Sequence, residues 1–272
     1  MNGSRSRPRV LTVAGSDSGG GAGIQADLKT FSALGVFGMT AITAVTVQNT
    51  LGVAGFEALS SQMVGDQIRA VVTDIGVDAA KTGMLATTEI VRGAAEALGA
   101  MGVPNLVVDP VFVSKHGNRL LAEDAVGALR SDILPLATLV TPNLPEAAGL
   151  ADLAVSTRDD MRRAADAILS FGPRAVLVKG GHLEGSNEAA DLFVAGEVEE
   201  WLITPRIDTP HTHGTGCTLS AAIVAYLARG TDLLEAVRAG KAFVTEAIRH
   251  ALSMGRGIGP VDQLWSIPSS PD

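Results

Sequence analysis

The residues best suited to chemistry lie in the run His211-Thr-His-Gly-Thr-Gly-Cys-Thr218. This run opens the apolar segment Thr215 to Ala228, whose composition predicts a buried helix. A Gly-Thr-Gly turn at a helix N-terminus exposes unpaired N–H groups at the positive end of the dipole, and such a turn binds anions, phosphate above all. Cys217 would lie in the first helical turn, where the thiol pKa is lowered and the thiolate is favoured. The alternative is a structural cysteine, since free Cys is usually buried and inert.

A second glycine cluster, Gly15-Ser-Asp-Ser-Gly-Gly-Gly-Ala-Gly23, lies between a predicted strand at 10–14 and a predicted helix at 22–34. It lacks the Gly-Lys-Ser/Thr of a P-loop and the glycine spacing of a dinucleotide-binding turn. Glycines let the backbone approach a ligand closely. A flexible turn is the alternative, but this density of Gly, Ser and Asp at a strand end favours a ligand-binding loop.

Three further groups of polar residues follow predicted strands. Asn143 and Glu146 are three residues apart, so one helix face could present both to a hydrated Mg²⁺ ion, which commonly uses few protein ligands. A helix cap built from the same two residues is the alternative. Lys179, followed by two glycines, either contacts phosphate or is a solvated lysine at a strand end. Asp109, before Pro110, is either an acid on the metal or phosphate side or a turn residue.

Short apolar runs alternate with amphipathic segments along the whole chain. Helices are predicted at 22–34, 61–74, 88–100, 158–170, 215–228 and 233–252, and strands at 10–14, 39–47, 77–81, 105–109, 139–141 and 175–179, followed by a hairpin at 191–202 that turns at Gly196. This alternation predicts an α/β fold of three layers, α/β/α, with a mostly parallel central sheet. Ligands of such sheets bind beyond the carboxyl ends of the strands, which is where the polar clusters fall.

Composition and charge exclude several classes of protein. Hydrophobic residues make up 46% of the 272 residues and charged residues 18%, which is unlike a disordered chain, and a net charge of −8 is unlike a nucleic-acid binder. A single cysteine allows no internal disulfide. No apolar run reaches the roughly 20 residues of a membrane span, and no signal-peptide pattern is present. We therefore expect a cytoplasmic protein without nucleic-acid or membrane partners, with one domain at 9–267 and flexible tails at 1–8 and 268–272.

Taken in order, these clusters resemble the hydroxymethylpyrimidine/phosphomethylpyrimidine kinases of thiamine synthesis, within the ribokinase-like family. The resemblance covers about residues 9 to 265. The matching runs are Val13-Ala-Gly-Ser-Asp-Ser-Gly-Gly-Gly-Ala-Gly-Ile-Gln-Ala-Asp-Leu-Lys-Thr-Phe31, Ala44-Val-Thr-Val-Gln-Asn-Thr50, Lys81-Thr-Gly-Met84, Val108-Asp-Pro-Val111, Thr141-Pro-Asn-Leu-Pro-Glu146, Val178-Lys-Gly-Gly-His182 and Thr212-His-Gly-Thr-Gly-Cys-Thr218. The resemblance implies phosphorylation, dependent on ATP and Mg²⁺, of 4-amino-5-hydroxymethyl-2-methylpyrimidine and then of its monophosphate, by a homodimer.

The resemblance also implies a role for each matching position. The pyrimidine site would consist of two hydrogen-bonding side chains and an apolar wall: Asp27 and Gln48, with Gly15, Ala22, Met84 and Val111. The nucleotide side would consist of Asp109, Asn143, Glu146, Lys179 and His213, the first three near Mg²⁺ and reached through water. The anion hole would consist of Gly214, Thr215 and Gly216, with Cys217 as the thiolate base for the substrate hydroxyl. The loop at 113–119 is expected to close as a lid.

Two positions depart from the family's pattern. His211 stands where an Asn-like or basic residue is expected, which affects contacts on the nucleotide side. The segment Gly257-Ile-Gly-Pro-Val261 lacks the His often found between its glycines, which affects the C-terminal edge of the site.

Four alternatives fit part of the sequence. A pyridoxal kinase of the same fold is the nearest, but Asp27 and Gln48 favour the aminopyrimidine. A hydroxyethylthiazole kinase would share the Gly-Thr-Gly-Cys run without explaining the first glycine cluster. A cysteine hydrolase using Cys217 and His213 lacks a clear third residue to orient the pair. A non-catalytic pyrimidine-binding sensor would bind its ligand without turning over ATP.

Overall fold

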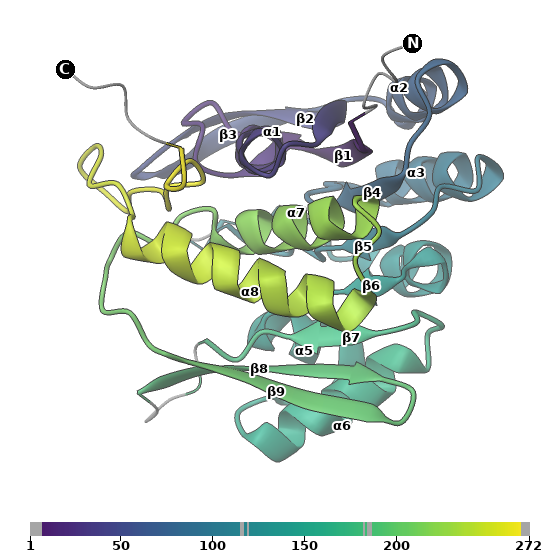
Figure 1. The fold of residues 1–272 in the computed structure, drawn as a ribbon. Helices are drawn as coiled ribbons and strands as arrows, with labels where there is room; N and C mark the ends of the chain where they lie inside the picture. The colour runs from purple at the N-terminus through teal and green to yellow at the C-terminus, as the bar shows by residue number, and fades with distance from the viewer. Residues whose placement is uncertain (1–6, 115–116, 119, 182, 184–186, 268–272) are drawn as a thin grey trace, which may run out of the picture.

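The computed structural model describes residues 7–114, 117–118, 120–181, 183 and 187–267. Strands and helices alternate along the chain, as the apolar periodicity predicts (Figure 1). The strands are β1 (Arg9–Ser16), β2 (Phe37–Asn49), β3 (Gly52–Ala58), β4 (Ala79–Thr82), β5 (Leu106–Val108), β6 (Leu139–Val140), β7 (Val176–Val178), β8 (Glu188–Ala195) and β9 (Val198–Pro205). The helices are α1 (Gly23–Ala33), α2 (Ser61–Asp74), α3 (Thr88–Ala100), α4 (Ala125–Ala128), α5 (Leu144–Ala151), α6 (Arg158–Leu169), α7 (Thr215–Ala228) and α8 (Leu233–Arg249), with a π-helical turn at Leu129–Ile133 and a 3-10 turn at Leu134–Leu136.

These strands form one sheet, in the order β3-β2-β1-β4-β5-β6-β7-β8-β9. Neighbours from β2 through β7 are parallel. Strands β3, β8 and β9 pair antiparallel at the two ends of the sheet. The prediction of a mostly parallel sheet is therefore confirmed.

An apolar core lies on each face of the sheet. Helices α1, α7 and α8 pack on one face around residues such as Phe31 and Ile223. Helices α2, α3, α5 and α6 cover the other face around residues such as Ile68 and Ile168. Figure 1 shows α7 and α8 lying across one face of the sheet, and the predicted three-layer α/β/α architecture is confirmed. Within the described ranges, no helix combines the length and the apolar character needed to cross a membrane.

The parallel register brings the carboxyl ends of the central strands to one edge of the sheet. Val13 of β1 pairs with Thr82 of β4, Thr82 with Val108 of β5, and Val108 with Val140 of β6. The residues that follow these strands therefore emerge side by side. This edge of the sheet positions the candidate site.

Strand β3 is absent from the sequence-based prediction. Its sequence, Gly-Val-Ala-Gly-Phe-Glu-Ala, holds few β-branched residues, and four of its seven positions are exposed, so neither composition nor alternation distinguishes it from a loop. It forms an antiparallel hairpin with β2, from Ala44↔Ala58 to Asn49↔Gly52. This hairpin carries Gln48, one of the predicted site residues.

The predicted tails fall largely outside the described residues, which exclude 1–6 and 268–272. Pro8, the last residue of the predicted N-terminal tail, accepts a hydrogen bond of 2.7 Å from the Phe37 N–H and is held beside β2. Both apolar cores share the single sheet, so we propose that residues 9–267 form one domain.

Candidate active site

The two glycine clusters meet in the structure. Gly214 caps α7 with a φ of +82°, and a side chain there would clash with the carbonyl oxygen of Gly21. Gly21 also packs on the ring of His213, where a Cβ would lie 2.5 Å from Cδ2. The backbone N–H of Gly23 hydrogen-bonds the sulfur of Cys217. Segments from near the two ends of the sequence therefore build one site.

We expect Gly214→Ala to destabilise the protein and to slow turnover more than its matched control, Gly230→Ala. The two glycines flank α7 with φ of +82° and +84°, a left-handed conformation that costs an L-residue about 1–2 kcal/mol. Only at Gly214 does the added Cβ also meet backbone, whereas nothing lies within 4 Å at Gly230. Urea denaturation and steady-state kinetics measure the difference. Equal losses in the two variants would show that the glycine clusters do not need their close contact.

Asp17 organises the first glycine loop. Its carboxylate accepts hydrogen bonds from the N–H groups of Gly19 (2.8 Å), Gly21 (3.0 Å) and Ala22 (2.8 Å), and His213 Nε2 lies 2.9 Å away. Burial opposes ionisation, but the bonds from His213 and from the backbone outweigh it and lower the pKa of Asp17. The sequence analysis did not single out Asp17, because an aspartate in a glycine-rich turn has no distinctive spacing.

The His213 side chain does not join the nucleotide-side residues, contrary to the prediction. It is 7% exposed, and besides Asp17 its Nε2 contacts the side-chain nitrogen of Gln48 at 3.2 Å. Gln48 is a predicted pyrimidine contact, and its backbone N–H and C=O both bond the Ser18 hydroxyl, at 2.8 and 2.7 Å. His213 therefore belongs to the glycine-loop side of the site. Because Nε2 is engaged there, it is not available as a base for Cys217.

Lys179 joins the residues that follow β5 and β6. Its Nζ lies 2.9 Å from Asp109 Oδ1 and 3.9 Å from Glu146 Oε2, and the side chains of these acids are only 2% and 4% exposed. Gly216 is adjacent, since a Cβ there would lie 3.4 Å from Lys179 Nζ and 3.6 Å from Asp109 Oδ2. The N-terminal turn of α7 thus faces a buried cation held by two acids.

The two acids beside Lys179 differ in their electrostatics. Burial opposes ionisation of Asp109, but the ammonium groups of Lys179 and Lys81 outweigh it and lower the pKa of Asp109. Burial raises the pKa of Glu146 to about 7, because the attraction of Lys179 does not offset it and the charge of Asp109 adds to it. Burial also opposes the charge on Lys179, but Asp109 and Glu146 raise its pKa. At neutral pH an ionised Asp109–Lys179 pair therefore stands beside a Glu146 that is partly protonated.

Asn143 and Glu146 form the helix cap that the sequence offered as the alternative to metal binding. The Glu146 N–H donates to Asn143 Oδ1 at 2.9 Å, and the Asn143 N–H donates to Glu146 Oε2 at 2.8 Å, at the start of α5. In the part of the chain that the structure describes, no three His, Cys, Asp or Glu side chains gather closely enough to hold a metal ion. The carboxylates of Asp109 and Glu146 suit Mg²⁺, which uses few protein ligands and keeps most of its water.

Asp27 lies behind the site, which corrects the prediction of a direct substrate contact. Its oxygens lie 3.0 and 3.2 Å from Lys81 Nζ, and Oδ2 accepts a 2.6 Å bond from the Thr12 hydroxyl. All three side chains are fully buried. Burial opposes the charge on Lys81, but Asp27 and its acidic neighbours raise the pKa of Lys81, so it stays an ammonium. The sequence analysis gave Lys81 no role, because spacing does not reveal a fully buried ion pair.

Cys217 lies in the first turn of α7, as predicted, but its thiol is not activated as predicted. Burial raises the pKa of Cys217 to about 11. Asp27 and Asp109 act in the same direction, whereas Lys81 and the Gly23 N–H favour the thiolate without offsetting burial. The expectation of a lowered pKa rested on the helix N-terminus, and desolvation outweighs that effect here. The neutral thiol therefore predominates at pH 7.

The predicted apolar residues lie around the same edge of the sheet. Gly15 packs on Met84, since a Cβ on Gly15 would lie 3.0 Å from Met84 Sδ. Ala22 is half-buried at the start of α1 and bonds Asp17. Val111, also half-buried, follows Asp109 in a turn closed by a 2.9 Å backbone bond. These positions suit the walls of a site for a flat ring.

The two features that depart from the family pattern, His211 and the segment 257–261, contact one another. The Gly259 N–H donates to His211 Nδ1 at 3.0 Å. Residues 251–261, which we call the C-terminal strap, also bond both backbone groups of His213, and the Ile258 N–H donates to Thr50 O at 2.9 Å. His211 therefore holds the strap in place. The strap links the β2–β3 turn to residues 214–217 at the start of α7, which we call the anion turn.

The predicted lid at 113–119 falls partly outside the described residues, which exclude 115, 116 and 119. The Ser114 N–H donates to Asn118 O at 2.7 Å across this segment. Closure of the segment stays a prediction.

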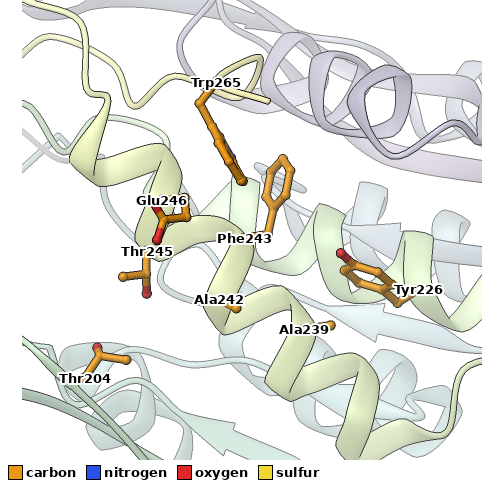
Figure 2. Close-up of a pocket in the computed structure, with 8 residues that line it drawn as sticks. All are labelled: Thr204, Tyr226, Ala239, Ala242, Phe243, Thr245, Glu246 and Trp265. Carbon is orange, nitrogen blue, oxygen red and sulfur yellow. The ribbon is translucent and has the colours of Figure 1, made fainter. Parts of the chain in front are cut away.

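A hollow of about 510 Å³ lies over α8, away from the strand ends. Its lining is mostly apolar (Figure 2). The one charged side chain of the lining, Glu246, is paired with Arg249. It offers no cation to a phosphate group, so we place the active site at the strand ends and not here. The lining residues are Thr204, Tyr226, Ala239, Ala242, Phe243, Thr245, Glu246 and Trp265.

Comparison with solved structures defines the class of protein. The structure of an ADP complex of Bacillus subtilis pyridoxal kinase is 42% identical, covers 95% of this chain and 98% of its own, and has a TM-score of 0.89. The phosphomethylpyrimidine kinase of Clostridium difficile is 45% identical, covers 88% of this chain and 99% of its own, and has a TM-score of 0.79. The chain has the ribokinase-like fold of these enzymes and is a kinase.

Comparison of sequences defines the family. The family model for phosphomethylpyrimidine kinase matches residues 17–262. The hydroxymethylpyrimidine/phosphomethylpyrimidine kinase of Streptomyces coelicolor is 55% identical over 260 residues, which is 96% of each chain. The chain belongs to the phosphomethylpyrimidine kinase family, and the resemblance drawn from its motifs is confirmed.

Proposed function

We propose that this protein transfers the γ-phosphoryl group of ATP to the hydroxymethyl group of 4-amino-5-hydroxymethyl-2-methylpyrimidine and then to the resulting monophosphate, within thiamine biosynthesis. The observation that carries the proposal is the contact of the two glycine clusters at Gly21 and Gly214, beside the Lys179 cluster. A loop that approaches a flat ring, an anion turn and a buried cation are what such a transfer requires.

In the proposed reaction the hydroxymethyl oxygen attacks the γ-phosphorus in line with the leaving ADP oxygen. Backbone N–H groups of Gly214, Thr215, Gly216 and Cys217 stabilise the charge on the transferring group, and Lys179 neutralises the phosphates. The hydroxyl proton passes to the sulfur of Cys217. A thiolate whose pKa is about 11 is scarce at neutral pH but strongly basic, so it suits an alcohol.

We propose that Mg²⁺ accompanies ATP at the carboxylates of Asp109 and Glu146, reached through water. A bound Mg²⁺ ion would supply charge neutralisation of the phosphates. The support is the Glu146 carboxyl beside Asp109: burial raises the pKa of Glu146 to about 7, and the Lys179 ammonium, 3.9 Å away, does not offset that effect. Asn143 contributes through its cap of α5, which holds Glu146 in place.

The test is ADP release with the pyrimidine alcohol, its monophosphate and pyridoxal, compared side by side. We expect release with the first two. No ADP with either pyrimidine would overturn the proposal. ADP with pyridoxal alone would support the second candidate, a pyridoxal kinase, which is favoured by a likeness to solved pyridoxal kinases at TM-scores up to 0.89.

We propose a cytoplasmic homodimer, without membrane or nucleic-acid partners, that associates through the β2–β3 hairpin. The hairpin exposes Val45 (50%), Val47 (66%), Leu51 (54%) and Phe56 (40%), which is unusual for a free sheet end. The single cysteine supports a cytoplasmic location. The net charge of −8 supports the absence of nucleic-acid partners.

Val47→Glu should therefore produce a monomer, because burying an unpaired carboxylate opposes association. Its matched control is Val198→Glu, which places the same charge on an exposed valine of β9 at the opposite end of the sheet. Light scattering after gel filtration gives the mass of each variant. A wild-type monomer, or a Val47→Glu variant that stays dimeric, would contradict the assignment of this face.

A further inference from the structure

The Asp17 carboxylate is held in its ionised form. It is 2% exposed, and four N–H groups converge on it: the backbone N–H of Gly19, Gly21 and Ala22, at 2.8, 3.0 and 2.8 Å, and the His213 ring at 2.9 Å. An ionised carboxylate only accepts hydrogen bonds, so each of these four partners must donate.

It follows that His213 Nε2, the nitrogen that faces Asp17, carries a proton. The ring cannot easily turn away from this partner. The backbone N–H of His213 donates to Gly259 O at 3.1 Å, the His213 carbonyl accepts from the Val261 N–H at 3.0 Å, and the ring packs on Gly21 through Cδ2. Asp17 and the strap thus fix both the tautomer and the position of His213.

This tautomer decides which way the Gln48 amide points. One branch of that amide lies 3.2 Å from His213 Nε2 and the other lies 3.4 Å from the Thr46 hydroxyl. Two N–H donors cannot bond each other, and half a turn of the amide exchanges its oxygen and nitrogen without changing its shape. With the oxygen toward His213, Oε1 shares the one N–H of Nε2, which donates mainly to Asp17 Oδ2, and the NH₂ group donates to Thr46. This arrangement removes the contact between two donors, and it leaves one amide N–H unused.

We propose that Asp17 and His213 are positioning residues for substrate recognition, which together present Gln48 to the substrate as a hydrogen-bond donor. Gln48 then recognises the lone pair of a ring nitrogen and not the N–H of an exocyclic amine. The inference rests on the proposed function for the identity of the ring. The backbone of Gln48 is already fixed by Ser18, so the orientation of its amide is the part of this contact left for His213 to set.

The first test removes groups from the substrate one at a time. Analogues in which either ring nitrogen is replaced by CH, or in which the amino group is replaced by hydrogen, are compared by their KM. For the wild-type protein we expect loss of one ring nitrogen to raise KM by about 10–100-fold, because a buried donor is left unpaired. Loss of the amine should change KM much less. The KM for ATP should not change.

His213→Phe should weaken this order, because it removes the N–H that orients the Gln48 amide and leaves that amide free to turn. Asp17→Asn is the matched conservative variant: its amide oxygen can take the position of Oδ2, which faces the N–H groups of Gly21, Ala22 and His213, so the order of the wild type should persist. Gln48→Glu, which can only accept, should reverse the order, so that the amine matters more than the ring nitrogen, without changing the KM for ATP. A purely structural role for His213 would lower activity on every analogue alike, and that result, or an unchanged order in His213→Phe or Gln48→Glu, would overturn the proposal.

A second readout needs neither substrate nor activity. Nitrogen-15 NMR correlations distinguish the two tautomers of a histidine, and loss of one signal set in His213→Gln assigns His213 among the five histidines of the chain. We expect the Nε2–H form in the wild type and in Asp17→Asn. The Nδ1–H form in the wild type would overturn the inference even if the kinase assay succeeds. Conversely, absence of ADP with the Nε2–H form present would reject the proposed function and leave the Asp17–His213 geometry intact.

Discussion

Replacing Cys217 by alanine should slow phosphoryl transfer by about 10²–10⁴-fold, the usual contribution of a general base. The sulfur lies in the first turn of α7 and bonds the Gly23 N–H, so the change removes a proton acceptor without removing the backbone N–H groups of the anion turn. The KM for the pyrimidine should change little. Steady-state kinetics with the pyrimidine alcohol give both values.

The pH dependence of turnover tests whether Cys217 acts as a general base. Because the pKa of Cys217 is about 11, only about one molecule in 10⁴ carries the thiolate at pH 7, and this fraction grows tenfold with each pH unit below that value. Turnover of the wild type should therefore rise with pH, whereas Cys217→Ala should lose this rise. A Cys217→Ala variant with wild-type turnover would remove the thiol from the base role and leave only the anion turn.

Lys179→Met should reduce kcat by about 10²–10³-fold, the cost of losing one preorganised charge in a catalytic site. Methionine keeps most of the length of the side chain but leaves Asp109 and Glu146 without the ammonium that lies 2.9 and 3.9 Å from them. Without the ammonium, the negative charge of these acids repels the phosphates of ATP, so the KM for ATP should rise as well. Calorimetry of ATP binding and measured kcat values test the two effects separately.

The matched control for Lys179→Met is Arg92→Met, which removes one positive charge from an exposed side chain on α3. Arg92→Met should leave both kcat and the KM for ATP at wild-type values. If the two variants behaved alike, the effect would come from net charge and not from a phosphate site. Thermal unfolding of both proteins shows whether the loss of the buried cation also costs stability.

Much of the fold follows from local signals in the sequence. Helices α2 and α3 have the predicted bounds, because Ser60 and Thr87 cap them and their apolar residues repeat at helical spacing. Strand β3 gave no such signal, because it is held by pairing with β2 and exposes much of its surface. Its existence depends on a tertiary contact that periodicity does not encode.

The candidate site was predictable in outline and not in its electrostatics. The rule that ligands bind beyond parallel strands selected Asp109 and Lys179, and the structure pairs them. The roles expected of Asp27 and Cys217 depended on exposure and pKa, which burial sets. The partner of Asp27 is Lys81, on a different strand, and the partner of His213 is Asp17, near the other end of the sequence. Such pairs arise only when the chain has folded.

The C-terminal strap has a consequence for the protein during its synthesis. The sheet strands that precede α7 can pair as soon as they leave the ribosome, but His213 finds its backbone partners only in residues 251–261, which are made last among the elements of the site. A nascent chain can therefore reach a nearly complete fold while its anion turn stays unanchored. Catalytic competence should be acquired as one of the final events of translation, and a stalled or proteolysed chain that ends after α8 should be folded but inactive.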